Sequence, residues 1–423
     1  MSKISMDNTK QKEKVFLVVV DFKKQRNTWL SNDILKEMEN LVTAADAKVV
    51  GGIIVSILKP SASHLIGEGK IEEIASLSSG VDADTIIFSQ DIKASQKRNL
   101  EKELKARVID RNQLILDIFA RRATSAEGKM QVELAQLQYL LPRLTGRGVE
   151  MSRLGGGIGT LGPGETKLEI DKRLINSKIS KLKKGLASVS LSRNLKRKKR
   201  KDTQVPAVAL VGYTNAGKST LLNLLTESDQ VTKDGLFTTL DSLSRQFILP
   251  NKQHVILSDT VGFMHELPHD LIEAFKTTLE EVKQADVLLH VIDVSHPTFR
   301  NLRDSVIKVL DELQVLDKPI INVFNKIDKL EDKSWLESLE GNFENAVSTS
   351  AHTKEGVDNL LIEISEMLSA LFIEINVDVP MNRMDLVGLA HQQGQVYSIK
   401  YYSDKINIRV AVPTSIIGKF TKI

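Results

Sequence analysis

The chain has 423 residues and contains no cysteine, which excludes disulfide bonds, zinc–thiolate sites and cysteine nucleophiles. It also lacks long apolar runs: segments such as FLVVV and VLLHVIDV have the length of a strand and are too short to span a bilayer. The opening stretch MSKISMDNTKQKEK is polar and carries no apolar signal segment. We therefore expect a cytoplasmic protein without a transmembrane segment, and weak association with a membrane surface stays open.

The first part of the chain has the pattern of an α/β domain. Between Val15 and Asp110, short β-rich runs alternate with amphipathic segments, which predicts a parallel sheet covered by helices. From about Asn112 to Leu141 we expect a long helical stretch that is broken at Pro142. The glycine-dense segment that follows, RLTGRGVEMSRLGGGIGTLGPGETKLE, is too poor in large apolar residues to pack a core, so it is predicted to be a loop.

Strands and helices alternate again after a charged helix that is expected from about Thr166. The β-rich runs QVYSIKYYS and KINIRVAVP near the end of the chain predict a hairpin around Asp404. The predicted fold class is α/β with mostly parallel sheets and a small C-terminal β-containing module. The predicted division is an N-terminal α/β domain (1–111), a helical linker subdomain with the glycine-rich loop (112–204), a second α/β domain (205–372) and the C-terminal module (373–423).

The second α/β domain begins with a phosphate-binding loop. The run GYTNAGKST, residues 212–220, follows the apolar stretch VPAVALV and precedes LLNLL, so it reads as a strand, a glycine turn and a helix. Its spacing is G-x-x-x-x-G-K-[ST], in which backbone amides cradle phosphates, Lys218 reaches the terminal phosphates and the hydroxyl of Ser219 can bind Mg²⁺. The predicted nucleotide contacts are Gly212, Tyr213, Thr214, Asn215, Ala216, Gly217, Lys218 and Ser219. The substrate is predicted to be a nucleoside triphosphate.

A second motif, DTVG at residues 259–262, ends the apolar run HVILS. This puts Asp259 at the carboxyl end of a strand, where it can hold Mg²⁺ through water. The amide of Gly262 can contact the γ-phosphate. The predicted nucleotide contacts here are Asp259, Thr260, Val261 and Gly262.

Between these motifs lies LFTTLD, residues 236–241, in a polar stretch that fits a switch loop. Thr238 and Thr239 compete for the role of a second hydroxyl ligand to Mg²⁺, and neither chemistry nor spacing separates them. The predicted nucleotide contacts in this loop are Phe237, Thr238, Thr239, Leu240 and Asp241.

The base is predicted to be guanine. In NVFNKID, a carboxylate at Asp328 can accept hydrogen bonds from the ring N–H and the exocyclic amine of guanine, whereas adenine presents an acceptor at that ring nitrogen. Sites built around a required hydrogen bond discriminate by about 10⁴ or more. We expect Lys326 to pack its stem over the base and brace the phosphate loop. The segment STSA would add backbone amides, so the predicted contacts are Asn325, Lys326, Ile327, Asp328, Ser350, Ala351 and His352.

One expected catalytic group is missing. Many GTPases carry a glutamine after the DxxG motif that orients the attacking water, and here that position is Phe263. We expect slow intrinsic hydrolysis, completed by a partner, a rearranged switch or a polar residue elsewhere. His265, Glu266 and His269 lie just downstream as candidates, and no catalytic residue is assigned beyond phosphate stabilisation by Lys218.

Basic residues gather around the glycine-rich loop. The run from Arg193 to Lys201 holds seven basic residues, and the loop region contains Arg143, Arg147 and Arg153. Such a pair of basic segments favours contacts to nucleic acid phosphates. A flexible connector is the alternative interpretation of the glycine segment.

With these motifs in place, the chain resembles the HflX family of bacterial GTPases over most of its length. The specific segments are IDRNQLILDIFARRATSAEGKMQVELAQLQYLLPRL, GGGIGTLGPGETKLEIDKR, the LFTTLD switch and DTVGFMHELPHDLIEAF. The resemblance implies a Ras-like GTPase domain that depends on Mg²⁺ and favours Thr239 as the metal-binding threonine. It also implies a partner in the large ribosomal subunit and its RNA, with a role in separating or rescuing stalled ribosomes under stress. Leu161 stands where the family usually has arginine.

Two other hypotheses stay open. The chain could be a GTP-regulated scaffold or signalling protein with a non-ribosomal partner. An ATP-using RNA remodeller is the third, although Gly67, Gly69 and Lys70 in LIGEGK lack the first glycine and the hydroxyl residue of a phosphate loop. DNA is not expected as a partner, and a monomer is the default.

Overall fold

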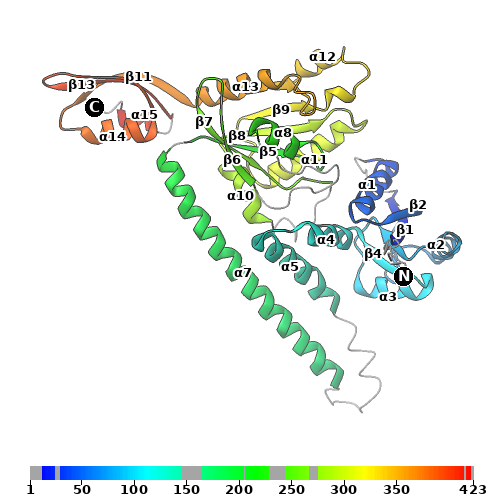
Figure 1. The fold of residues 1–423 in the computed structure, drawn as a ribbon. Helices are drawn as coiled ribbons and strands as arrows, with labels where there is room; N and C mark the ends of the chain where they lie inside the picture. Colours follow the sequence, from blue (N-terminus) through cyan, green and yellow to red (C-terminus); the bar gives the residue numbers. More distant parts are fainter. Residues whose placement is uncertain are drawn as a thin grey trace, which may run out of the picture. The chain divides into compact units, whose positions relative to one another are not determined.

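The computed structural model describes residues 12–23, 29–144, 163–203, 205–227, 243–265, 275–413 and 416–420 (Figure 1). The chain divides into two compact units, and of the described residues the first contains 12–185 and the second 186–420. The predicted α/β class with mostly parallel sheets is confirmed by the sheet orders. The proposed division into four domains stays a prediction.

The first unit contains a four-stranded sheet of order β2-β1-β3-β4 whose neighbours are all parallel. Its strands are β1 (Lys14–Phe22), β2 (Lys48–Ile57), β3 (Thr85–Phe88) and β4 (Arg107–Asp110). The central β1, KVFLVVVDF, is buried along most of its length, as expected of a strand covered on both faces. Its covering helices are α1 (Ser31–Ala44), α2 (Glu68–Gly80) and α3 (Ala94–Leu104).

The helical region after the sheet is divided into separate helices. It consists of α4 (Arg111–Arg122), α5 (Ala126–Leu140) and the 3₁₀ turn η1 (Leu141–Leu144). The predicted helical stretch is present as two helices, because Ala123 is extended and the Ser125 side chain accepts a hydrogen bond from Gly128 N at 2.8 Å, which starts a new helix. The predicted break at Pro142 is present as η1.

Helix α7 (Pro163–Thr203) is 41 residues long and ends in the basic run of the sequence. It begins in the first unit and ends in the second. Its sequence is strongly charged, and none of the helices in the described ranges combines the length and apolar character needed to cross a bilayer.

The second unit contains a six-stranded sheet of order β10-β9-β8-β5-β7-β6, parallel except for the antiparallel edge pair of β6 and β7. The strands are β5 (Ala207–Gly212), β6 (Leu243–Ile248), β7 (His254–Asp259), β8 (Val287–Asp293), β9 (Ile320–Asn325) and β10 (Ala346–Ser348). The helices with them are α8 (Lys218–Leu225), α10 (Lys276–Gln284), α11 (Phe299–Glu312), η2 (Ile327–Lys329), α12 (Leu336–Glu340) and α13 (Val357–Ala370). One apolar core joins the sheet to α8 and α13, which makes the central strands a rigid base for the loops at their carboxyl ends.

The C-terminal part of the second unit is a three-stranded antiparallel sheet of order β11-β13-β12. Its elements are β11 (Phe372–Pro380), α14 (Met384–Gln393), β12 (Gln395–Tyr401), β13 (Lys405–Pro413) and α15 (Ile417–Phe420). The predicted hairpin is confirmed, since β12 and β13 pair on either side of Asp404. A separate apolar cluster from the sheet, α14 and α15 forms its core.

Candidate nucleotide-binding site

The phosphate loop connects β5 to α8 in the predicted strand–turn–helix order. Gly212, Asn215 and Gly217 have φ values of 155°, 62° and 96°. Gly217 precedes the first residue of α8, and a Cβ atom there would lie 2.2 Å from Nδ2 of Asn325. Only glycine fits this position, because both the backbone conformation and the neighbouring amide exclude a side chain.

Lys218 is the first residue of α8 and is buried. Its Nζ donates to the carbonyl oxygens of Gly212, at 3.0 Å, and Tyr213, at 2.8 Å. Burial lowers the pKa of Lys218 to about 8, against a smaller opposing effect of the Asp259 carboxylate. The ammonium group is therefore a concentrated positive charge enclosed by the loop, which suits contact with phosphate oxygens.

Asp259 ends β7, as the sequence predicted, and lies beside the start of α8. Ser219 Oγ donates to Asp259 Oδ2 at 2.6 Å. The next residue, Thr260, donates from Oγ1 to the carbonyl of Leu210 at 2.7 Å and so holds the end of β7 against β5. The hydroxyl and the carboxylate predicted to serve the metal are thus brought together from two elements.

The DTVG segment lies directly against the phosphate loop. A Cβ at Gly262 would lie 2.8 Å from Cγ2 of Thr214 and 3.2 Å from Nζ of Lys218, so glycine permits this close approach. Phe263, at the position of the missing glutamine, is only 1% exposed. Its side chain belongs to the interior, which explains how an apolar residue is accommodated there.

The predicted base-reading residues come from the ends of β9 and β10. Asn325 is buried, donates from Nδ2 to the Ala216 carbonyl at 2.8 Å and accepts from the Ala351 amide at 3.0 Å. It therefore links the phosphate loop to the STSA segment. Asp328 accepts from Ser350 Oγ at 2.5 Å. Of the remaining predicted residues here, Ile327 is buried and His352 is exposed.

Lys326 contacts the phosphate loop, as predicted, and also makes an ion pair that was not predicted from the sequence. Its Nζ donates to the Asn215 carbonyl at 2.6 Å and pairs with Asp293 Oδ2 at 2.7 Å. The other oxygen of Asp293 accepts from the hydroxyl of Ser295 at 2.6 Å and from its amide at 3.1 Å. Asp293 ends β8, and its place at the carboxyl end of a central parallel strand was the signal that could have identified it.

Several predicted residues lie outside the described residues. They are Phe237, Thr238, Thr239, Leu240 and Asp241 of the switch segment, Glu266 and His269 after DTVG, and Arg147 and Arg153 of the glycine-rich segment. His265 is described, and its amide donates to the hydroxyl of Tyr213 at 2.9 Å.

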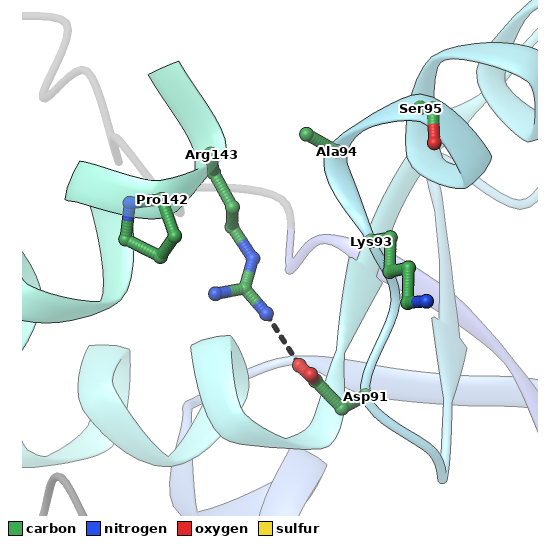
Figure 2. A pocket seen from close by; sticks show the side chains of 6 residues that line it. All are labelled: Asp91, Lys93, Ala94, Ser95, Pro142 and Arg143. Carbon is green, nitrogen blue, oxygen red and sulfur yellow. Dashed lines mark hydrogen bonds and ion pairs between the residues drawn. The ribbon is translucent and has the colours of Figure 1, made fainter. Parts of the chain in front are cut away.

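Arg143, a candidate RNA contact, has an intramolecular environment in the first unit. Figure 2 shows its guanidinium directed at Asp91 across a pocket of about 370 Å³ that Lys93, Ala94, Ser95 and Pro142 also line. Nη2 lies 3.3 Å from Oδ2 of the buried Asp110, and the guanidinium stacks 3.6 Å from the ring centroid of Tyr139. The positive charge is thus already matched by two carboxylates.

The mostly parallel sheet, the phosphate loop after β5, and the acidic and amide groups at the ends of β7 and β9 define a P-loop nucleotide-binding protein of the G-protein class. Four family models match the chain in succession. Their descriptions are the N-terminal region of GTP-binding GTPases (32–120), the middle region (122–200), a 50S ribosome-binding GTPase (207–326) and the HflX C-terminal domain (337–412).

Curated relatives match nearly the whole chain. The GTPase HflX of Caldanaerobacter subterraneus subsp. tengcongensis is 44% identical over 91% of this chain and 88% of the relative. That of Escherichia coli K12 is 42% identical over 82% of each chain. A crystal structure of a GTP-binding protein from Sulfolobus solfataricus with GDP is 26% identical, covers 84% of this chain and 99% of that one, and has a TM-score of 0.43. The chain belongs to the HflX family of GTPases, and its enzymatic class is GTP hydrolase.

Proposed function

We propose that this protein is a GTP-driven switch that binds the large ribosomal subunit and promotes ribosome dissociation or rescue under stress. The observation that carries the proposal is the joining of a phosphate loop to a guanine-type base site through Asn325, whose amide contacts both. The ribosomal partner is supported by the model described as a 50S ribosome-binding GTPase, which covers the phosphate loop and DTVG. Family models also match the segments before and after that region, which supports a contribution of the whole chain to the proposed function.

The residue roles follow from position and chemistry. The enclosed ammonium of Lys218 neutralises the terminal phosphates. Gly262, which approaches Lys218 closely, contacts the γ-phosphate and responds to its loss. Asp328 accepts two hydrogen bonds from guanine, and Ser350 and Ala351 complete the base site. The remaining predicted contacts of the phosphate loop and of DTVG, NKID and STSA line the same nucleotide.

The donor set suits Mg²⁺, which prefers oxygen ligands and usually keeps several waters. Ser219 Oγ and Asp259 Oδ2 are 2.6 Å apart at the start of α8, so a hydroxyl and a carboxylate already face one another. Ser219 would bind the ion directly and Asp259 through water, with Thr239 as the proposed second hydroxyl. When bound, Mg²⁺ would neutralise charge on the phosphates.

Contacts to ribosomal RNA are proposed for Arg143, Arg147 and Arg153 and for the basic end of α7. The run NLKRKKRK lies in the sequence of α7, and its high density of basic residues suits contact with phosphates. A steep fall of ribosome affinity with salt is expected from phosphate contacts. The proposed setting is a monomer in the cytoplasm.

Phe263 has a mechanistic consequence. Its buried side chain offers no group to orient water, so hydrolysis by the protein alone is expected to be slow. The ribosome would complete or rearrange the catalytic geometry, and GTP hydrolysis would then weaken the complex. This makes stimulation by ribosomal subunits the critical property.

The test measures GTP hydrolysis by the purified protein alone and with large ribosomal subunits at near-physiological salt. We expect the subunits to stimulate GTP hydrolysis strongly. Lys218→Ala should abolish both this stimulation and nucleotide binding. Sucrose-gradient analysis of intact ribosomes with GTP would then reveal subunit separation. Tight GTP binding without stimulation or ribosome binding would instead favour the GTP-regulated scaffold with another partner.

A further inference from the structure

A short backbone bridge joins the phosphate loop to the segment after DTVG. Phe263 N donates to the Gly212 carbonyl at 3.1 Å, and Thr214 N donates to the Phe263 carbonyl at 2.8 Å. These bonds form a parallel bridge in which Tyr213 lies opposite Phe263. The residue that replaces the usual glutamine is therefore fixed by its main chain to the loop that holds phosphates.

The side chain of Tyr213 adds a third attachment. Its hydroxyl accepts from the amide of His265 at 2.9 Å, two residues beyond the bridge. The ring is buried, with 9% of the residue exposed, and the Tyr213 carbonyl accepts from Lys218 Nζ at 2.8 Å. One residue thus contacts both the phosphate-loop lysine and the beginning of the segment downstream of DTVG.

These attachments determine where Gly262 lies. It immediately precedes the bridged Phe263, and the space for a Cβ is filled by Thr214 and the Lys218 ammonium. A shift of the downstream segment would move the Gly262 amide relative to Lys218. Because the Phe263 side chain is buried, another group has to orient the water, and the residues just after Phe263 are among the candidates. The position of the main chain at His265 therefore bears on catalysis.

We propose that Tyr213 is a positioning residue for GTP hydrolysis, whose hydroxyl holds the His265 amide and keeps the segment after DTVG in register with the phosphate loop. The proposal rests on the proposed GTPase function of this site. Small misplacements of catalytic groups are costly, since a displacement of about 1 Å can reduce a rate by about 100-fold. Tyr213 touches no reacting atom in this role and acts through the main chain of residues 262–265.

The test is Tyr213→Phe, which keeps the buried ring and removes the hydroxyl that accepts from the His265 amide. With saturating large subunits, kcat for GTP is expected to fall about 3- to 10-fold, the range that one lost hydrogen bond supports. KM for GTP and the Kd for GDP should change less than about twofold, because the bonds of the loop itself remain. The control is Tyr397→Phe, which removes an exposed hydroxyl from the C-terminal sheet and should leave kcat unchanged.

A second measurement separates positioning from general destabilisation. Amide hydrogen exchange at His265 should become faster in Tyr213→Phe, while exchange in the buried strand β5 stays as in the wild type. If the wild type hydrolyses GTP normally and Tyr213→Phe has an unchanged kcat, with or without a raised KM, the inference is overturned. A wild type that hydrolyses no GTP with or without subunits would overturn the proposed function itself.

Discussion

Ser350 donates a hydrogen bond from its hydroxyl to Oδ1 of Asp328 at 2.5 Å, although the two residues follow different strands of the sheet. The Ser350 hydroxyl also accepts from the amide of Thr353 at 3.0 Å, so its orientation is fixed by a turn. Asp328 therefore has one oxygen held by the loop after β10. A carboxylate held in this way is preorganised for a fixed pattern of donors, which is what discrimination between bases requires.

Asp328→Asn is expected to weaken GTP binding at least about 100-fold and to shift preference toward xanthosine triphosphate. Xanthine carries a carbonyl where guanine has its exocyclic amine, and an amide can donate to that oxygen. Competition between the two triphosphates measures the shift. Asp332→Asn is the matched control, since Asp332 is exposed and caps Ser334 in the neighbouring loop. Retained GTP selectivity in Asp328→Asn would show that another group reads the base.

Asp293 should affect the affinity for guanine nucleotides without affecting the preference for guanine over adenine. Its ion pair with Lys326 is largely buried, with the two side chains 17% and 15% exposed, and Lys326 in turn contacts the phosphate loop at Asn215. In Asp293→Asn we expect GTP and GDP affinities to fall together, by about 10-fold, because the buried charge of Lys326 loses its partner. Isothermal titration with each nucleotide measures this.

The control for this variant is Asp304→Asn, which removes an exposed acid that pairs with Arg303 on α11. It should bind both nucleotides like the wild type, as surface ion pairs contribute little. If Asp293→Asn bound GTP normally, or lost its preference for guanine over adenine, the bracing role would be contradicted.

The comparison of Phe263 and Asp293 shows what the sequence could predict. The motifs have fixed spacing, and each follows an apolar strand of a parallel sheet, so their meeting at one edge follows from topology. Phe263 was identifiable as a substitution in such a motif. For Asp293 the only signal was its place at the end of an apolar strand, because a lone acid there has no spacing rule and its role depends on the approach of Lys326.

The helical region from Arg111 to Leu144 shows a different limit of prediction from the sequence. The sequence from Asn112 to Leu141 contains no proline, so the two helices read as one stretch until the cap formed by Ser125 is seen. Arg143 is a similar case: a basic residue beside a glycine-rich loop indicates a nucleic acid contact, while Asp91 and Asp110 reach it only after the chain folds. Local sequence pattern could not report the long-range contacts of Arg143.

Lys218 gives the stability of the folded protein a defined dependence on pH. Burial lowers its pKa to about 8 in the folded protein, below the usual 10.5, so between these values the unfolded chain binds more protons than the folded one. The contribution of Lys218 to stability is therefore unfavourable below about pH 8 and improves as the pH rises toward 10.5. The wild type should gain stability relative to Lys218→Met over this window, as measured by denaturant unfolding at pH 7.5, 9 and 10.

The same lowered pKa predicts proton uptake when GTP binds. Phosphate anions favour the charged ammonium, so at pH 8.5 binding should take up about half a proton or more. Calorimetry in buffers with different ionisation enthalpies measures this number directly. Binding heats that do not depend on the buffer at pH 8.5 would contradict the lowered pKa of Lys218.

Arg143 should stabilise the first unit through its pairing with buried Asp110. That carboxylate also accepts from the amides of Ile92 and Gln113 and from the hydroxyl of Tyr139. Removing the cation leaves a buried charge with fewer partners, which costs about 3 kcal/mol. Arg143→Gln should therefore lower the protection of the Ile92 and Gln113 amides by about 100-fold in native-state hydrogen exchange.

Lys93→Gln is the matched control, because Lys93 lines the same pocket (Figure 2) and its loss should change stability by no more than about 0.5 kcal/mol. Equal protection of the Ile92 and Gln113 amides from exchange in the two variants would contradict the pairing of Arg143 with Asp110.

The salt dependence of ribosome binding tests the proposed RNA contact of Arg143 on its own. A residue that contacts phosphate lowers the slope of log affinity against log salt by about 1 when it is removed. An unchanged slope with lowered protection would assign Arg143 to the stability of the first unit alone.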